Sequence, residues 1–443
     1  MKLLFVCHHF PPYNTAGAQL FALYLAKELC LLDHEVEIFY PVNISHKLAP
    51  KSKKYSVKTS TYQNLIVHEV VVDDTSGGIF EENPSYYYDN HKINQIFKDL
   101  LLKNKYDIIH FHLLHRLGFG LPIVAKILGI PSLITLHDYW FLCPRGHMID
   151  SSQNVCEGPE SEKKCAACLD YLKYGKLYSL LRLFRKFRFF KATSVKLKKD
   201  IKINKKVLNY VRNRAEAANE GYHAIDVRIS PSEYLAQTYA SFGLKKPEVL
   251  PIGWIPLKRK ENQKPPGHIT FGFAGQIIPR KGLDVLIKAF SRIKGDCSLH
   301  IYGEINDEAY FIPLKQCIEK HQNMTYFGCF CPNDLQGIYN SIDVMVVPSR
   351  RENYPLTILE ALSTQTPVIA SNVGGVSEII KHSDNGWIFK NEDTKELSGL
   401  LQSIVDGPDK IEKVSSNITP IKSIEENARE YQKIYDTLLR SSE

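Results

Sequence analysis

The sequence predicts an α/β protein built from two Rossmann-like, doubly wound domains that face each other across a cleft. Short apolar runs rich in Val, Ile and Phe alternate with segments of helical periodicity, as in parallel sheets covered by helices. A proline-rich stretch interrupts this alternation after residue 246, and the alternation then starts again. The length of 443 residues is enough for two or three domains.

The first half opens with the apolar strand KLLFV, which directly follows Met1. Residues 18–32 then carry helical periodicity, and EVEIFY predicts a second strand. Because the later runs are apolar throughout rather than alternating, we expect them to be strands buried on both faces of a parallel sheet. These further strands are expected at 108–112, 132–137 and 224–230.

The best candidate for a linker is the stretch that holds Pro247, Pro251, Pro256 and the run Pro265-Pro266-Gly267. We therefore predict an N-terminal domain at 1–246 with an insertion at about 143–222, and a C-terminal domain at 247–423. A helix at 424–443 is expected to cross back to the N-terminal domain. In the second half, strands are expected at 269–275, 298–303, 324–328, 344–349 and 367–371, with helices at 283–292, near 307–320 and from about 356.

Composition excludes several classes of protein. Apolar residues make up 44% of the chain and charged residues 23%, which is typical of globular proteins and not of disordered, collagenous or coiled-coil chains. No apolar run approaches the ~18 residues of a spanning helix. The N-terminal apolar stretch is too short for the core of a signal peptide, so we expect a cytoplasmic protein with reduced cysteines.

Positive charge is concentrated in one segment. Residues 171–215 hold fifteen Lys or Arg and one acid, whereas the rest of the chain is net acidic. An apolar stripe of Leu and Phe at 177–187 lies beside Arg182, Arg185 and Lys186, which predicts a basic helix around 176–215 at an anionic membrane surface. The alternatives are an amphipathic helix packed on its own domain, or binding of nucleic acid, for which no recognition motif is present.

Four cysteines cluster within the predicted insertion: Cys143, Cys156, Cys165 and Cys168. Four thiols at such spacing suit a closed, tetrahedral structural zinc site. An iron–sulfur cluster and unliganded or redox-active thiols are the alternatives. Since the cluster follows the strand that ends at His137, we expect it to shape one side of the cleft.

The main chemical signal lies in the second half. The strand ITFGFAG ends at Gly275, and the turn QIIPRKG places Arg280 and Lys281 before a helix. Cations beside the N-terminus of a helix favour a phosphate group. The alternative is a solvated basic loop.

A pair of carboxylates follows in VVPSRRENYPLTILEAL, with Glu352 before a Pro355-initiated helix and Glu360 within it. Two carboxylates at different depths suit hydrogen bonds to two sets of sugar hydroxyls. The amides from Tyr354 to Thr357 are helix-start donors for an anion. The alternative is a surface helix with an incidental pair of glutamates.

Together these motifs resemble the retaining nucleotide-sugar glycosyltransferases of family 4, which have the GT-B fold. The matching segments are ENYPLTILEA, GQIIPRKG, PVIASNVGGVSEII with NGWIF, IYGE at 301–304, and the N-terminal loop PPYNTAGAQ. The resemblance covers nearly the whole chain except 143–222. It implies an N-terminal acceptor domain and a C-terminal donor domain.

The resemblance implies a role for each matching residue. Lys281 would hold the donor diphosphate, Glu360 the ribose and Glu352 the hydroxyls of the donor sugar. His137 would lie near the transferred sugar. The implied donor site comprises Gly17, Gly275, Gln276, Arg280, Lys281, Glu352, Asn353, Tyr354, Pro355, Leu356, Thr357 and Glu360, and the implied catalytic residues are Glu352, His137 and Lys281.

Three positions depart from the family pattern. Gln276 stands where Arg is usual, Ala16 replaces one of two glycines in the N-terminal loop, and Gln365 replaces a glycine. We expect Arg280 to supply the cation that is missing at Gln276. These departures keep open a non-catalytic protein that binds nucleotide sugars.

The implied reaction transfers a sugar from a nucleoside diphosphate sugar to a lipid-linked or polysaccharide acceptor, for cell-surface glycans, at the inner face of the plasma membrane. No Asp-x-Asp occurs in the chain, so no metal cofactor is expected at the catalytic centre. The leaving phosphate would accept the proton of the acceptor, and His110 and His112 are expected to be structural. A nucleotide-sugar epimerase or a phosphorylase is the alternative enzyme.

Overall fold

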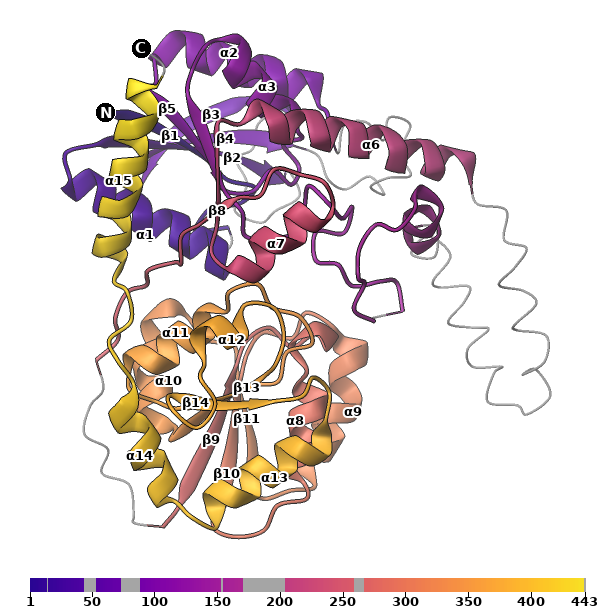
Figure 1. Cartoon of the computed structure of the whole chain (residues 1–443), viewed down its shortest axis with the longest axis vertical. Helices are drawn as coiled ribbons and strands as arrows, with labels where there is room; N and C mark the ends of the chain where they lie inside the picture. Colours follow the sequence, from indigo (N-terminus) through magenta and orange to yellow (C-terminus); the bar gives the residue numbers. More distant parts are fainter. Residues whose placement is uncertain are drawn as a thin grey trace.

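The computed structural model describes residues 1–13, 15–43, 53–72, 88–152, 154–169, 204–258 and 267–441. It has two sheets, each flanked by helices, stacked along the long axis of the molecule (Figure 1). All strand pairs are parallel apart from one at an edge of the first sheet. The predicted α/β architecture with two parallel sheets is therefore confirmed.

The first sheet has eight strands in the order β3-β4-β2-β1-β5-β6-β7-β8, and only β3 and β4 pair antiparallel. Strands β1, β5 and β6 are entirely or almost entirely buried, as their apolar sequences predict. The strands are β1 (Lys2–Val6), β2 (Glu35–Asn43), β3 (Val57–Tyr62), β4 (Leu65–Val72), β5 (Ile108–Phe111), β6 (Ser132–Thr135), β7 (Val227–Ser230) and β8 (Glu248–Val249).

Helices connect these strands, and their starts follow ordinary capping chemistry. The Asn90 side chain accepts hydrogen bonds from the first amides of α2, and Ser232 does the same for α7. The antiparallel hairpin of β3 and β4 and the helix α2 are not among the elements that the sequence patterns predicted. The helices are α1 (Gly17–Leu31), α2 (His91–Asn104), α3 (Gly120–Ile127), α6 (Lys205–Ala224) and α7 (Glu233–Ser241).

The second sheet has six parallel strands in the order β11-β10-β9-β12-β13-β14. The central strand β9 is buried at every position. The strands are β9 (Ile269–Ala274), β10 (Cys297–Tyr302), β11 (Met324–Gly328), β12 (Val344–Val347), β13 (Val368–Ser371) and β14 (Gly386–Phe389). The helices are η4 (Pro279–Lys281), α8 (Leu283–Phe290), α9 (Glu308–Glu319), η5 (Pro332–Asp334), α10 (Leu335–Ser341), α11 (Leu356–Ser363), α12 (Val376–Ile379), α13 (Thr394–Val405) and α14 (Asp409–Asn417).

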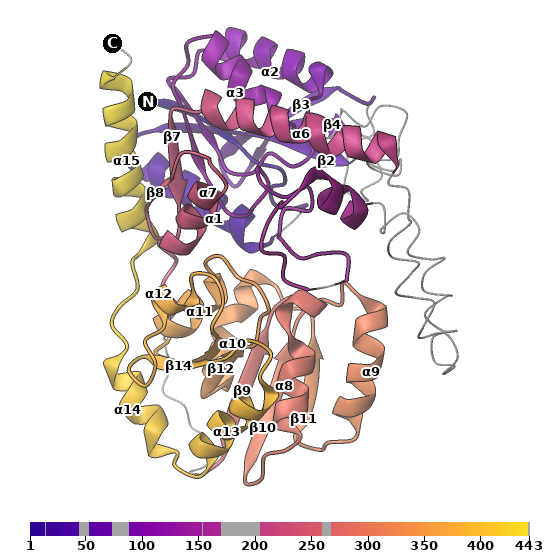
Figure 2. The same ribbon diagram turned by 45° about the vertical axis from the view of Figure 1, so that its right-hand side comes forward.

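The last helix, α15 (Ile424–Arg440), follows the elements of the second half in the chain but packs against α1, beside the first sheet (Figure 2). Its buried face includes Tyr431 and Tyr435, which share a core cluster with Phe21 of α1. Ser423 and Glu426 form a capping box at its start, so the helix begins at a defined residue. The chain thus ends against the half of the molecule in which it began.

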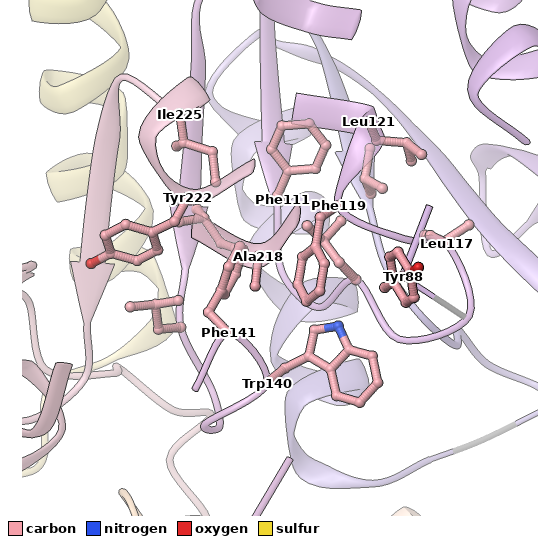
Figure 3. Packing of buried hydrophobic residues seen from close by; sticks show 14 of the residues in the cluster. Tyr88, Phe111, Leu117, Phe119, Leu121, Trp140, Phe141, Ala218, Tyr222 and Ile225 are labelled. Carbon is pink, nitrogen blue, oxygen red and sulfur yellow. The ribbon is translucent and has the colours of Figure 1, made fainter. Parts of the chain in front are cut away.

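A second core cluster fixes the segment that follows β6. Figure 3 shows Trp140 and Phe141 packed with Phe119 and Tyr222, which come from the region of α3 and α6. The ring centres of Phe119 and Phe141 are 5.0 Å apart, and those of Phe141 and Tyr222 are 5.3 Å apart. Aromatic packing of this kind holds the start of the insertion on the sheet.

Candidate active site at the junction of the two sheets

Loops that follow the strands of one sheet contact loops that follow the strands of the other, and we call this region the junction. The Asn353 side-chain amide, after β12, donates a hydrogen bond of 2.8 Å to the backbone oxygen of His137, after β6. Ligands of open α/β sheets bind outside the carboxyl ends of the strands. The junction is therefore where a site is expected.

Lys281 and Glu352 meet at the junction, although 70 residues separate them in the chain. The Lys281 Nζ lies 2.6 Å from Glu352 Oε1, and the Glu352 side chain is only 8% exposed. Burial raises the pKa of Glu352, but the charges of Lys281 and Arg280 and hydrogen bonds from Lys281 and Ser349 outweigh it, so the pKa lies below its ordinary value. Glu352 is thus an ionised carboxylate beside two cations.

Glu360 lies apart from this pair, in the middle of α11, where the Tyr339 hydroxyl donates a 2.8 Å hydrogen bond to it. Burial raises the pKa of Glu360 to about 7, although hydrogen bonds from Tyr339 and Trp254 and the charge of Lys281 oppose the rise. The two glutamates therefore differ in charge state near neutral pH. Such a difference suits two separate roles.

The starts of two helices meet at the junction. A Cβ at Gly17, the first residue of α1, would lie 2.7 Å from the Leu356 side chain, and Leu356 is the first residue of α11. A side chain at position 17 would therefore displace Leu356. Helix N-termini carry partial positive charge and unpaired amides, so their approach favours an anion between them. Tyr354, Pro355 and Thr357 lie on or beside the start of α11.

The remaining predicted residues lie in the turn after β9, at the junction. Gly275 follows β9, Gln276 is exposed, and Arg280 and Lys281 form the short helix η4. Gly282, which ends this turn, has φ +69°, and a Cβ there would lie 2.0 Å from the Pro348 backbone oxygen. Only glycine therefore fits this position.

Arg350 holds the turn, although no sequence motif pointed to it. Its guanidinium forms hydrogen bonds of 2.8 Å with both oxygens of Asp284 and one with the backbone oxygen of Pro279. It also pairs with Glu392. Hence this cation positions η4.

Arg351, which directly precedes Glu352, was also missed. Its buried guanidinium crosses the junction and lies 4.6 Å from the ring centre of Tyr139 and 5.6 Å from that of Tyr234. Its Nη2 is 3.7 Å from the sulfur of Met148. Contacts between the cation and the aromatic rings tie the segment of Glu352 to the insertion and to α7.

Glu378 makes a further contact across the junction. Its two carboxylate oxygens accept hydrogen bonds of 2.8 Å from the backbone amides of Glu233 and Tyr234, at the start of α7. A carboxylate is favoured at a helix N-terminus. Glu378 thereby joins α12 of the second half to α7 of the first.

His137 is half-buried at the junction, with its Nε2 3.3 Å from Nδ1 of His112. Burial lowers the pKa of His137 to about 4, against a smaller opposing effect of Asp138. The rings of His112 and His110 stack 4.2 Å apart, and His110 hydrogen-bonds to Tyr435 of α15. Burial lowers the pKa of both histidines well below the ordinary value, so all three rings are neutral near pH 7.

The predicted zinc site is not supported. All four clustered cysteines lie in the described part of the chain, and within that part no group of three or more His, Cys, Asp or Glu is placed to hold a metal ion. The Cys156 thiol instead donates to the Gly158 backbone oxygen, 3.4 Å away. All ten cysteines are free thiols, and Cys143, Cys156, Cys165 and Cys168 are half-buried.

The predicted basic membrane helix lies largely outside the described residues, because 170–203 are not described. Residues 205–215, the end of the predicted helix, are described and lie in α6. Within them, Arg214 does not lie on a surface, as the prediction of a basic membrane-facing helix requires. This side chain is buried, donates to the Trp140 backbone oxygen and lies 4.3 Å from the Trp140 ring centre, because it packs into the core beneath the insertion. Among the described residues, no helix has the length and apolarity to span a membrane.

The fold and the junction define the class of protein: a glycosyltransferase of the GT-B type. The family model described as Glycosyltransferase Family 4 matches residues 15–254, and that of Glycosyl transferases group 1 matches 255–419. The chain belongs to Glycosyltransferase Family 4. The resemblance stated from the sequence motifs is therefore confirmed at the level of family and fold.

Solved structures share this fold over the whole chain. Sucrose-phosphate synthase from Thermosynechococcus elongatus has a TM-score of 0.67 at 17% identity, and 99% of each chain is covered. HepE from Anabaena, solved in complex with UDP-glucose, has a TM-score of 0.61 at 15% identity, with 100% of this chain and 99% of that chain covered. At these identities, the likeness concerns the fold alone.

Curated relatives match over shorter stretches. An uncharacterized glycosyltransferase of Methanocaldococcus jannaschii is 35% identical over 126 residues, which is 28% of this chain and 32% of that protein. D-inositol 3-phosphate glycosyltransferase of Rhodococcus erythropolis is 28% identical over 161 residues, which is 34% of this chain and 36% of that protein. The matches thus span about a third of the length of these relatives.

Proposed function

We propose that this glycosyltransferase uses a nucleoside diphosphate sugar as donor, retains the anomeric configuration and transfers the sugar to a lipid-linked or polysaccharide acceptor of cell-surface glycans. The observation that carries the proposal is the pair of Lys281 and Glu352, with Arg280 beside it. Cations placed beside a buried carboxylate can neutralise a diphosphate while the carboxylate binds sugar hydroxyls. Two proteins of the same fold were solved with UDP-glucose and with ADP and acarbose.

In the proposed reaction, an acceptor oxygen attacks the anomeric carbon while the bond from that carbon to the diphosphate oxygen breaks. The departing diphosphate gains negative charge and accepts the proton of the acceptor hydroxyl. Lys281, Arg280 and the amides at the start of α11 stabilise this charge. Removing one such electrostatic group typically lowers turnover by about 10²–10³-fold.

The other predicted residues take supporting roles. Glu352 binds the hydroxyls of the donor sugar, and Glu360 binds the ribose. His137, neutral near pH 7, acts as a hydrogen-bonding group near the transferred sugar. Gly17 leaves room for the phosphate between α1 and α11. The predicted boundaries at 246/247 and 423/424 separate an acceptor half, a donor half and a closing helix.

The donor is tested with a panel of nucleoside diphosphate sugars read by thermal shift. A ligand that binds only the native state raises the melting temperature, by RT ln(1 + [L]/Kd) in free energy. We expect at least one donor to raise it and to release nucleoside diphosphate when an acceptor is added. If no donor shifts the melting curve, the proposal is wrong. Donor binding without turnover across an acceptor screen would favour a binding protein.

Contact with an anionic membrane surface is part of the proposal, because fourteen Lys or Arg lie within 171–215 besides the buried Arg214. Vesicles that contain anionic lipid should carry the protein upward in a flotation gradient, and neutral vesicles should not. Reversing the charge of Arg182, Arg185 and Lys186 together should abolish flotation. Unchanged flotation of that variant would reject the membrane role.

A further inference from the structure

A histidine–carboxylate pair lies at the junction beside the predicted donor site. His115 follows β5 and Asp138 follows β6, two neighbouring strands of the first sheet. The His115 Nε2 lies 2.9 Å from Asp138 Oδ2, and the two side chains are 27% and 26% exposed. The pair is therefore accessible to a ligand, unlike the buried rings of His110 and His112.

Trp140 fixes the positions of both side chains. The second oxygen of Asp138, Oδ1, accepts a 2.9 Å hydrogen bond from the Trp140 amide. The His115 ring stacks on the Trp140 ring, with centres 3.6 Å apart and planes inclined by 28°. Since Trp140 is itself anchored in the core cluster of Figure 3, neither partner of the pair can turn freely.

The insertion approaches the His115 imidazole at Gly146. Gly146 has φ +74°, and a Cβ there would lie 2.8 Å from His115 Cε1 and 3.4 Å from Asp138 Oδ2. The Gly146 backbone oxygen accepts a hydrogen bond from the Tyr139 amide, which fixes this approach. A side chain at position 146 would displace the pair, so the loop is shaped around it.

Further histidines surround the pair. The ring of His8, at the end of β1, lies 5.4 Å from that of His115, and the charges of His115 and His137 both act on His8. His147 of the insertion directly follows Gly146, and His137 directly precedes Asp138. The pair thus lies next to His137.

We propose, on the basis of the function proposed above, that His115 binds the acceptor by accepting a hydrogen bond from its sugar hydroxyl. A carboxylate oxygen accepts hydrogen bonds, so the 2.9 Å contact with Asp138 Oδ2 places the proton of His115 on Nε2. With its Nε2 proton donated to Asp138, the imidazole can offer the lone pair of Nδ1 to a donor. Asp138 is the positioning residue that fixes this tautomer, as second-shell carboxylates do for other functional histidines.

Two substitutions separate this role from a structural one. His115→Gln removes the ring, and Asp138→Asn presents an amide that can donate to Nε2 and so moves the ring proton to Nδ1. With UDP-glucose as donor probe and p-nitrophenyl glucosides and galactosides as acceptor probes, both variants should raise the KM for the glycoside at least tenfold. The rise in melting temperature with UDP should stay within 1 °C of the wild-type rise. The matched control is His223→Gln, an exposed histidine at the end of α6, which should leave the KM unchanged.

A second readout does not need turnover. Nitrogen-15 NMR of the full chain should show His115 protonated on Nε2 in the wild type and on Nδ1 in Asp138→Asn. A wild-type ring protonated on Nδ1, or a glycoside KM within twofold of wild type in His115→Gln, would overturn the proposal. Failure of the proposed function would look different, because the wild type would then show no rise in melting temperature with any nucleoside diphosphate.

Discussion

The Nζ of Lys281 lies 2.6 Å from Oε1 of Glu352, in a site where the carboxylate is buried and Arg280 adds a second positive charge. The glutamate is thus paired with the lysine that we assign to the donor diphosphate. A bound diphosphate would share Lys281 with Glu352 and free the carboxylate for the sugar. This exchange links donor binding to the placement of the sugar.

Lys281→Ala should lower sugar transfer by about 10²-fold or more, because one cation is lost where the diphosphate gains charge. Steady-state release of nucleoside diphosphate measures the effect, and the melting curve of the variant shows whether it folds. Lys288→Ala is the control, since Lys288 is exposed on α8. Transfer by Lys281→Ala within threefold of wild type would contradict the assigned role.

Glu360 should lower stability as the pH rises. Its pKa of about 7 in the folded protein exceeds the ordinary value of 4.5. Its contribution to the free energy of unfolding is therefore complete below pH 4.5 and is lost as the pH rises through 7. The shift in pKa corresponds to a change in the free energy of unfolding on the order of 3 kcal/mol. Glu360→Gln keeps the oxygen that accepts from Tyr339 but cannot ionise.

We therefore expect the free energy of unfolding of Glu360→Gln, relative to wild type, to be higher at pH 8 than at pH 5. Urea denaturation at both pH values measures the difference. An equal difference between variant and wild type at the two pH values would mean that Glu360 does not titrate in this range.

The buried histidines should have the opposite effect. Burial lowers the pKa of His8, His110 and His112 well below 6.5, and that of His137 to about 4. The unfolded chain then binds more protons than the native state, so stability is complete above pH 6.5 and falls as the pH drops. Each ring contributes at most about 1.4 kcal/mol per pH unit.

Burial also lowers the pKa of His34 and His147, and it raises that of Glu28. Because these histidines outnumber the two glutamates, the net free energy of unfolding should fall between pH 6.5 and 5. Urea denaturation at half-unit intervals tests this sign. A stability that rises over that interval would show that these rings are protonated in the native state.

Glu378→Ala should weaken the contact between the two halves of the chain, since the start of α7 loses both hydrogen bonds from its amides. We expect a loss of about 1 kcal/mol, the usual value for a charge at a helix N-terminus, and a larger radius of gyration in X-ray scattering. Glu412→Ala, on the exposed face of α14, is the matched control. An unchanged radius of gyration would mean that other contacts hold the halves together.

Local patterns predicted much of this fold, for a physical reason. Buried parallel strands such as β9 are apolar at nearly every position, so they stand out in the sequence. The hairpin of β3 and β4 does not stand out in this way, because every residue of β3 is exposed or half-buried. The family motifs likewise identified Lys281 and Glu352 without any knowledge of their contact.

The cross-junction residues could not be predicted because their partners are remote in the chain. Arg351 approaches Met148, 203 residues away, and Glu378 binds an amide 144 residues away. Arg214 belongs to the basic segment 171–215, yet its cation is buried against Trp140. Only the fold shows whether a cation meets solvent, a carboxylate or an aromatic ring.

The most direct test of the central claim is a crystal structure of the full chain with UDP bound. We predict that its diphosphate contacts Lys281 Nζ and the amides at the start of α11, with the ribose at Glu360. A diphosphate bound elsewhere, with Lys281 and Glu352 still paired, would contradict the account.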